Sequence, residues 1–172
     1  MIRTFPTRPT FFVVLLFVAA TAVDAQQVSY PKAAPLFSIV VPGGWRAELQ
    51  ETNLTLLPDP EDKYFLQINA QPYSAAEALP HIATAIAEQL KLSNVALGTP
   101  IAGRNRHGLM CAVMTARGRS QSGETVITLA AFAPREGKYF TVQGVGTAAL
   151  DEKHSRETRA MIDSIAPIAP SK

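Results

Sequence analysis

The feature that most constrains the fold is a series of strand-like segments whose connections are too short for a crossover. Three consecutive segments, Leu109–Arg117, Thr125–Ala133 and Tyr139–Val145, are dominated by apolar and β-branched residues. The connections are rich in turn residues, and Arg135–Lys138 is typical of a hairpin loop with its glycine in the left-handed conformation. Parallel neighbours would need a connection of about a dozen residues or more. The three strands are therefore predicted to be antiparallel.

Further strands are predicted from short apolar or alternating segments elsewhere in the chain. Phe65–Gln71 alternates most clearly, because its amide side chains face one way and its leucine, isoleucine and alanine the other. Leu109–Met114 is apolar at every position, which predicts a central strand covered on both faces. The remaining predicted strands are Leu36–Val41, Trp45–Leu49, Leu54–Leu57 and Val95–Ile101.

Two amphipathic helices complete the pattern. The first follows a capping box formed by Ser74 and Glu77 and continues to about Leu92. Pro80 either kinks its first turn or is the first residue of the main helix. The second helix spans about Asp151–Ile165. The fold class predicted from these elements is α+β, with an antiparallel sheet of about six to eight short strands flanked by two main helices.

The N-terminus has the three parts of a secretory signal peptide in the expected order. Arg3 and Arg8 precede the uncharged apolar run Phe11–Val23, and small residues follow as far as Ala25. As a helix this run covers about 20 Å, which is shorter than the hydrocarbon core of a bilayer, about 30 Å. Residues 1–25 are therefore predicted to be cleaved, which gives a periplasmic or secreted product with no stable membrane anchor.

The rest of the chain is predicted to form a flexible lead-in at 26–35 and a single α+β domain at 36–168. The formal net charge is only +2, which argues against a nucleic-acid binder that neutralises phosphates. The only cysteine, Cys111, cannot form an internal disulfide. It lies within an apolar run, so it is expected to be a small buried hydrophobe rather than a reactive thiolate.

The order of these elements and two short segments resemble the PsbP/DcrB-like superfamily. The segments are Phe37-Ser-Ile-Val-Val-Pro-Gly-Gly-Trp45, which opens the domain, and Met161–Pro167, which closes it. The resemblance spans about Leu36–Ile168 and implies an antiparallel sheet flanked by helices in a sandwich. Relatives include extrinsic photosystem subunits, envelope proteins and effector-associated chaperones that hold apolar helices. The superfamily shares no catalytic motif, so the resemblance implies no site residue.

Four arginines form the first candidate partner-binding surface. They lie near the expected ends of adjacent strands and would concentrate positive charge at one end of the sheet, which suits an acidic partner or an anionic ligand. The alternative is a solvated hairpin whose charged tips discourage edge pairing. The four residues are Arg104, Arg106, Arg117 and Arg119.

A second candidate surface is an uncharged polar face, formed by Gln67, Asn69 and Gln71 with Thr141 and Gln143. Amide and hydroxyl groups recognise ligands through hydrogen bonds. A sheet face that simply contacts water has the same pattern, so both interpretations stay open.

No reactive constellation is visible in the sequence. His81, His107 and His154 are far apart and lack the closely spaced ligands of a zinc site, so no metal or other cofactor is predicted. His154 falls on the apolar face of the second helix, which favours a core or boundary histidine with satisfied hydrogen bonds. Polar side chains are expected to decorate surfaces rather than to converge on a reaction centre.

These observations predict an exported, non-enzymatic binding or accessory protein that acts as a chaperone-like holder of another envelope protein. One alternative is an inhibitor or immunity-type envelope protein that uses the arginines to block an acidic site. The other is a small secreted hydrolase, which would require His107 to converge with Asp59 or Glu61.

Overall fold

The structure is a computed structural model that describes residues 24–170 with the exception of 59 and 73. The signal-peptide prediction for residues 1–25 lies outside the described residues except for its last two positions. The elements, in chain order, are β1 (Gln26–Tyr30), β2 (Phe37–Val41), β3 (Arg46–Leu49), β4 (Asn53–Leu57), β5 (Phe65–Gln71), α1 (Ala75–Gln89), β6 (Ser93–Leu97), β7 (Ile101–Arg104), β8 (Met110–Ser120), β9 (Gly123–Arg135), β10 (Lys138–Thr147), α2 (Ala148–Ser164) and β11 (Ala166–Pro167).

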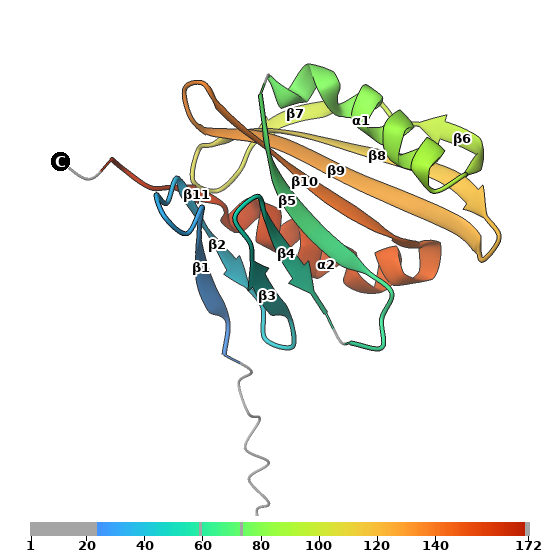
Figure 1. Ribbon diagram of the computed structural model, residues 1–172, viewed down its shortest axis with the longest axis horizontal. Helices are drawn as coiled ribbons and strands as arrows, with labels where there is room; N and C mark the ends of the chain where they lie inside the picture. Colours follow the sequence, from blue (N-terminus) through green and yellow to red (C-terminus); the bar gives the residue numbers. More distant parts are fainter. Residues whose placement is uncertain (1–23, 59, 73, 171–172) are drawn as a thin grey trace, which may run out of the picture.

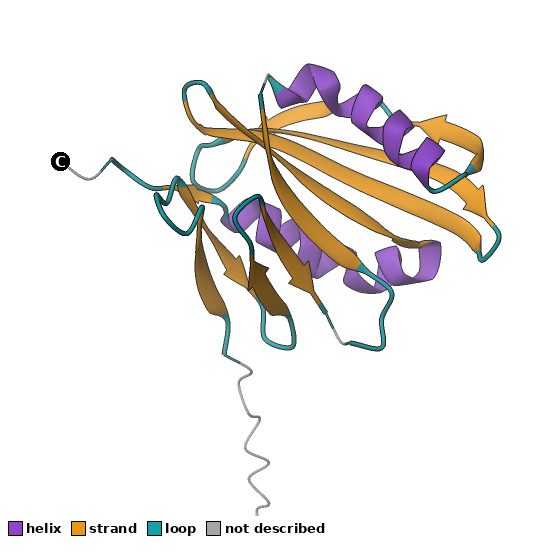
Figure 2. Cartoon of the chain, in the orientation of Figure 1, coloured by secondary structure: helices purple, strands orange, loops and turns teal. Residues whose placement is uncertain are grey.

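The main sheet is antiparallel and has the strand order β3-β4-β5-β10-β9-β8-β6, with β7 also paired to β8. A second sheet of three short strands has the order β1-β2-β11. Helix α1 lies on one face of the main sheet, and α2 lies on the other (Figure 1). Figure 2 shows the two helices separated by the layer of strands. The predicted α+β class, with an antiparallel sheet and two main helices, is confirmed.

Each helix covers only part of its face. Helix α1 packs on β8 and β9, where Leu79 and Ala83 meet Met114, Ile127 and Leu129. Helix α2 packs on β9, β10 and β2, and the core beneath it also includes aromatic side chains of the small sheet. The α2 face of β7 and β8 and the α1 face of β4 and β5 are therefore left without a helix.

The N-terminal lead-in is a strand, so the prediction of a flexible segment at residues 26–35 is wrong for its first half. Gln26–Tyr30 pairs along its whole length with β2. Val28 and Tyr30 are buried in the core, and Gln27 donates a hydrogen bond to Ser38. Two buried residues are too few to give a visible alternation, which is why the sequence pattern missed this strand.

The predicted strand Val95–Ile101 is divided into β6 and β7. Gly98 donates its N–H to the Thr115 carbonyl at 2.9 Å, and a Cβ at Gly98 would lie 2.5 Å from that oxygen. Pro100 has no N–H to contribute to a ladder. The chain therefore bends between the two strands before it pairs with β8 again.

Strand β8 is not covered on both faces, which corrects the prediction for Leu109–Met114. Cys111, Ala112 and Met114 are buried, but Met110 and Val113 are exposed. The physical reason is that α1 packs on one face of β8, whereas on the other face Cys111 joins the core beneath α2 and Val113 lines the open cleft.

The predicted capping box at α1 does not form, because the Ser74 side chain makes no capping hydrogen bond. The helix begins at Ala75 and contains Pro80, whose carbonyl accepts a hydrogen bond from Thr84. No described helix is long and apolar enough to cross a membrane.

Gly98→Ala is expected to destabilise the protein by about 1–3 kcal/mol, because the added methyl group would collide with backbone rather than with a movable side chain. Gly103→Ala, in the next strand, is the matched control. No atom lies within 4 Å of a Cβ at Gly103, so its stability is expected to stay within about 0.5 kcal/mol of the wild type. Urea unfolding measures both, and equal midpoints would contradict the assigned role of Gly98.

Candidate functional site

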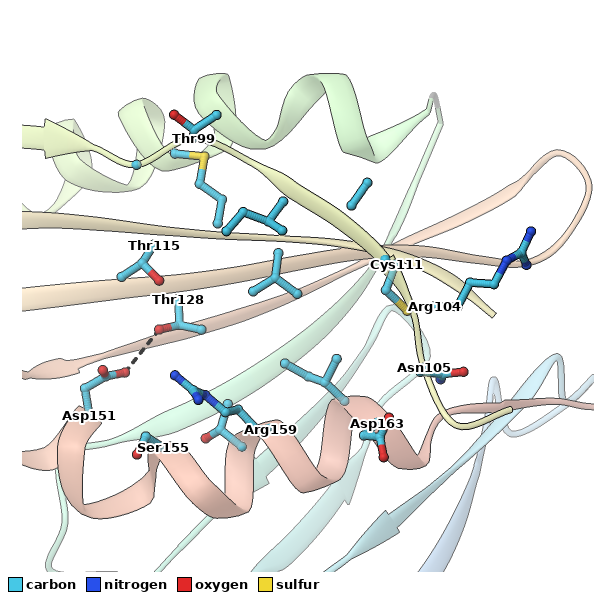
Figure 3. Close-up of a pocket in the computed structure, with 18 residues that line it drawn as sticks. Thr99, Arg104, Asn105, Cys111, Thr115, Thr128, Asp151, Ser155, Arg159 and Asp163 are labelled. Carbon is cyan, nitrogen blue, oxygen red and sulfur yellow. Dashed lines mark hydrogen bonds between the residues drawn. The ribbon is translucent and has the colours of Figure 1, made fainter. Parts of the chain in front are cut away.

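An open cleft of about 710 Å³ lies between α2 and the strands β7 and β8. Figure 3 shows α2 on one side of it and the strands on the other. Two apolar residues of the cleft floor are exposed to solvent, Ile101 at 74% and Val113 at 36%. These two residues are paired across β7 and β8 and therefore share a face of the sheet.

The wall that α2 contributes is polar. Asp151 accepts a hydrogen bond from Thr128 at 3.1 Å, which ties the start of the helix to β9. Near the other end of α2, Asp163 accepts a hydrogen bond from the Arg106 backbone N–H at 2.9 Å. Arg159 is exposed and lines the cleft (Figure 3), and within the described residues it has no ion pair or hydrogen bond.

Cys111 is the only cleft residue with a nucleophilic sulfur, and it is held in its thiol form. Its sulfur is buried beside the Leu109 carbonyl, 3.6 Å away. Burial, followed by the nearby Asp163 carboxylate, raises the pKa of Cys111 to about 11. No histidine lines the cleft. The cleft therefore presents shape and apolar surface rather than an activated nucleophile.

A histidine does meet two carboxylates, which corrects the expectation that polar groups would not converge. His154 is 5% exposed, and its Nε2 lies 2.8 Å from Asp62 while its Nδ1 lies 3.0 Å from Glu157. The Trp45 indole N–H donates to the same Glu157 oxygen, and the Tyr64 ring stacks on the imidazole with centroids 5.2 Å apart. This group is called the His154 cluster below.

The geometry of the His154 cluster is that of a structural clamp. Both ring nitrogens are occupied by carboxylates, so neither is available to a substrate proton. Asp62 borders a second hollow of about 500 Å³, but His154 lines neither that hollow nor the cleft. The cluster joins α2 to the loop before β5 and to the residue before β3. The expected core histidine with satisfied hydrogen bonds is found.

Two residues of the cluster have shifted pKa values, since burial raises the pKa of Tyr64 to about 12 and that of Asp62 is lowered. Hydrogen bonds from Lys153 and then from His154 hold the pKa of Asp62 below its ordinary value. Among the described residues, no group of histidine, cysteine, aspartate and glutamate is arranged to hold a metal ion.

The four arginines do not gather at one end of the sheet, so this part of the sequence prediction is wrong. Arg104 faces Met110 at the start of β8, whereas Arg117 and Arg119 lie near its end. At about 3.3 Å per residue, seven residues of β8 separate the two pairs by more than 20 Å. Of these four arginines, only Arg104 lines the cleft. The four do not form the single basic surface that the inhibitor hypothesis requires.

The polar amides do share one face, which is the face opposite the cleft. Gln67 is paired with Gln143, and Asn69 with Thr141, so all these side chains point to the α1 side of the sheet. They hydrogen bond among themselves, as Gln71 does to Thr141 at 2.9 Å. Whether this surface binds a partner stays a prediction.

The hydrolase alternative required His107 to meet an acidic residue near position 60, and the structure separates them. His107 lies in the turn before β8, where its ring accepts a hydrogen bond from Arg106. Glu61 lines the same hollow as Ser120, which is at the opposite end of β8. Asp59 is outside the described residues.

Sequence reasoning missed the cleft residues Ile101, Val113 and Arg159. The sequence contained a signal for Val113. The apolar run Leu109–Met114 predicts that both faces of its strand are covered, but two predicted helices are too few to cover both faces of the whole sheet. No local pattern distinguished Arg159 from the other exposed charges of the second helix.

Comparison with solved structures identifies the architecture. Cyanobacterial PsbP (CyanoP) from Synechocystis sp. PCC 6803 superimposes with a TM-score of 0.64 at 11% sequence identity, over 87% of this chain and 96% of that one. The chain has a PsbP-like fold. The fold that the sequence resemblance implied, an antiparallel sheet flanked by helices, is therefore confirmed.

Two further solved structures are similar to the chain. LpqN of Mycobacterium tuberculosis, described as involved in cell envelope biogenesis, has a TM-score of 0.53 at 12% identity, covering 85% of this chain and 91% of its own. A Pseudomonas aeruginosa protein of unknown function, PA94, a putative regulator, has a TM-score of 0.43 at 10% identity, covering 86% and 98%. No family model and no curated protein sequence matches the chain.

Asp62→Asn is expected to lower the urea midpoint at pH 7 because it removes the carboxylate that holds Lys153 and His154. Since the pKa of Asp62 is lowered by folding, its contribution is present above the unfolded-state pKa and is lost as the pH falls through the folded-state value. The difference between wild type and variant should therefore shrink in acid. Glu48→Gln, in an exposed ion pair with Arg46, is the control and should change little. A constant difference from pH 7 to pH 3 would contradict this role.

Cys111 is expected to react very slowly with a thiol reagent at pH 8 in the folded protein. With a pKa of about 11, roughly one thiol in a thousand is ionised at that pH, and burial slows access further. Ellman's reagent with and without denaturant measures the difference. Equal rates in both conditions would show that the cysteine is open and ionised.

Proposed function

We propose that this chain is an exported, non-catalytic binding protein that holds an apolar segment of another envelope protein in the cleft between α2 and β7–β8. The observation that carries the proposal is the exposed apolar floor formed by Ile101 and Val113. An apolar surface in a concave site is favourable to cover and unfavourable to leave in water.

The contrast between the two helix-free parts of the sheet supports this function. On the α1 side, the part without a helix carries partly exposed glutamine and asparagine side chains, which suit contact with water. On the α2 side, the part without a helix carries the exposed Ile101 and Val113, beside Thr115. A sheet that needed only solubility would have polar residues on both parts.

The contents of the cleft support a binding role rather than catalysis. Its carboxylates Asp151 and Asp163 already accept hydrogen bonds from the protein. The raised pKa of Cys111 keeps its sulfur protonated. The convergent His154 cluster, which is the arrangement most like a catalytic group, has no cavity at its histidine.

Two observations support an envelope location. Strand β1 begins at Gln26, directly after the predicted cleavage position, so cleavage there leaves every described strand intact. LpqN, which shares the PsbP-like fold, is described as involved in cell envelope biogenesis.

Site-specific photocrosslinking in the intact chain tests the proposal. A photoreactive amino acid at Ile101 is expected to crosslink one envelope protein in cells, and Val113→Glu in the same chain should remove the crosslink. The same amino acid at Asn69, on the opposite face, is the matched control and should not capture that protein. A crosslink that persists in the Val113→Glu chain, or that forms equally from Asn69, would contradict a cleft-based function, as would no crosslink from Ile101.

A further inference from the structure

The two edges of the main sheet differ in how they are protected. The β3 edge carries Arg46 and Glu48, whose side chains form an ion pair at 3.3 Å. The other edge, formed by β6 and β7, exposes Val95, Leu97 and Ile101. Charges on an edge strand discourage pairing with another chain, whereas an exposed apolar edge invites it.

The hydrogen-bond alternation of β7 shows which backbone groups are free. Asn105 donates its N–H to Leu109 at 3.0 Å, and bonding alternates from residue to residue along an antiparallel pair. Gly103 and Ile101 therefore direct their N–H and C=O groups toward β8. Those of Ala102 and Arg104 point outward, and within the described part of the chain no strand lies on that side.

We infer that the partner segment binds as an extended strand added to the outer edge of β7, which deepens the proposed function and rests on it. Ala102 and Arg104 together offer two donors and two acceptors to such a strand. Main-chain hydrogen bonds of this kind supply affinity, and alternate side chains supply specificity.

The cleft receives alternate side chains of the added strand. Residues of the partner opposite Ile101 and Gly103 would point to the same face as Ile101, which is the cleft face. Gly103 leaves open space there, because nothing lies within 4 Å of where its Cβ would be. The partner residues at these positions are therefore apolar.

Arg159 adds a charge requirement. Its guanidinium extends into the cleft without an ion pair or hydrogen bond among the described residues, whereas the cleft carboxylates are already hydrogen bonded. An acidic side chain on the cleft face of the partner strand would meet this cation. The partner is thus an extended segment with alternating apolar residues and an acidic residue in the same alternation.

Selection from a phage library of random twelve-residue peptides against the chain lacking residues 1–25 tests the inference. Enriched peptides are expected to show apolar residues at alternate positions with an acidic residue in register. Binding of a synthetic copy is expected to fall at least tenfold in Ala102→Pro, which removes an outward N–H without touching the ladder to β8. Ala47→Pro is the matched control. The Gln50 N–H donates to the Asn53 carbonyl between β3 and β4. By the same alternation, the Ala47 N–H points outward from the β3 edge of the sheet, which is opposite the β7 edge.

Two further experiments distinguish strand addition from other modes of peptide binding. Methylation of one edge-facing backbone nitrogen of the peptide should abolish binding while its side chains are unchanged. Peptides selected against the Arg159→Glu chain should carry a basic residue in place of the acidic one. Arg156 is exposed one turn earlier on α2, and peptides selected against the Arg156→Glu chain should keep the acidic residue.

Equal binding to Ala102→Pro and wild type, or tolerance of the methylated nitrogen, would overturn strand addition. Both results would leave the cleft function standing and point to a helical occupant. A failure to enrich any alternating peptide would overturn the inference, and the crosslink from Ile101 would then show separately whether the cleft holds a protein at all.

Discussion

The width of the sheet relative to a helix is the constraint on which the rest of the structure depends. A helix with its side chains is about 10–12 Å wide and strands are about 4.8 Å apart, so one helix covers little more than two strands. The main path of this sheet has seven strands, and each face carries a single helix. Part of each face must therefore be covered by something else or contact water. On the α2 side, aromatic side chains of the small sheet pack against Phe132 and Phe140 of β9 and β10, and the exposed β7–β8 surface lines the cleft.

The position of α2 decides where that cleft lies, and polar anchors hold the helix there. The His154 cluster fixes its first half to the loop before β5 and to Trp45. At its end, the Ser164 hydroxyl accepts a hydrogen bond from the Val40 N–H and donates one to Met161. These contacts tie α2 to β2, to the loop before β5 and to the residue before β3. A convergence of histidine and carboxylates that resembles catalytic machinery thus helps to set the position of α2.

Most elements could be predicted from local patterns, because period-two and helical spacing are properties of neighbouring residues. Phe65–Gln71 and the three C-terminal strands were placed by such patterns and are confirmed. The errors concern relations between distant residues. Strand β1 forms by pairing with β2, and the break between β6 and β7 depends on the contact of Gly98 with the Thr115 carbonyl. Of the two carboxylates that contact His154, Asp62 is 92 positions away in the sequence and Glu157 lies on the next turn of the same helix. The cleft belongs to this second class, since an apolar run in β8 cannot indicate which face a helix leaves open. The PsbP-like resemblance supplied the architecture but, with identities of 11–12% among the fold neighbours, no site.

Methyl NMR with a soluble paramagnetic chelate tests the central claim most directly, because it measures contact between side chains and solvent. The methyl groups of Ile101 and Val113 should relax strongly in the unbound protein. Those of Ile127 and Leu129, which are fully buried under α1, should be unaffected and serve as internal references. Relaxation of the Ile101 and Val113 methyl groups as weak as that of the references would show that the floor is covered, and would contradict the account.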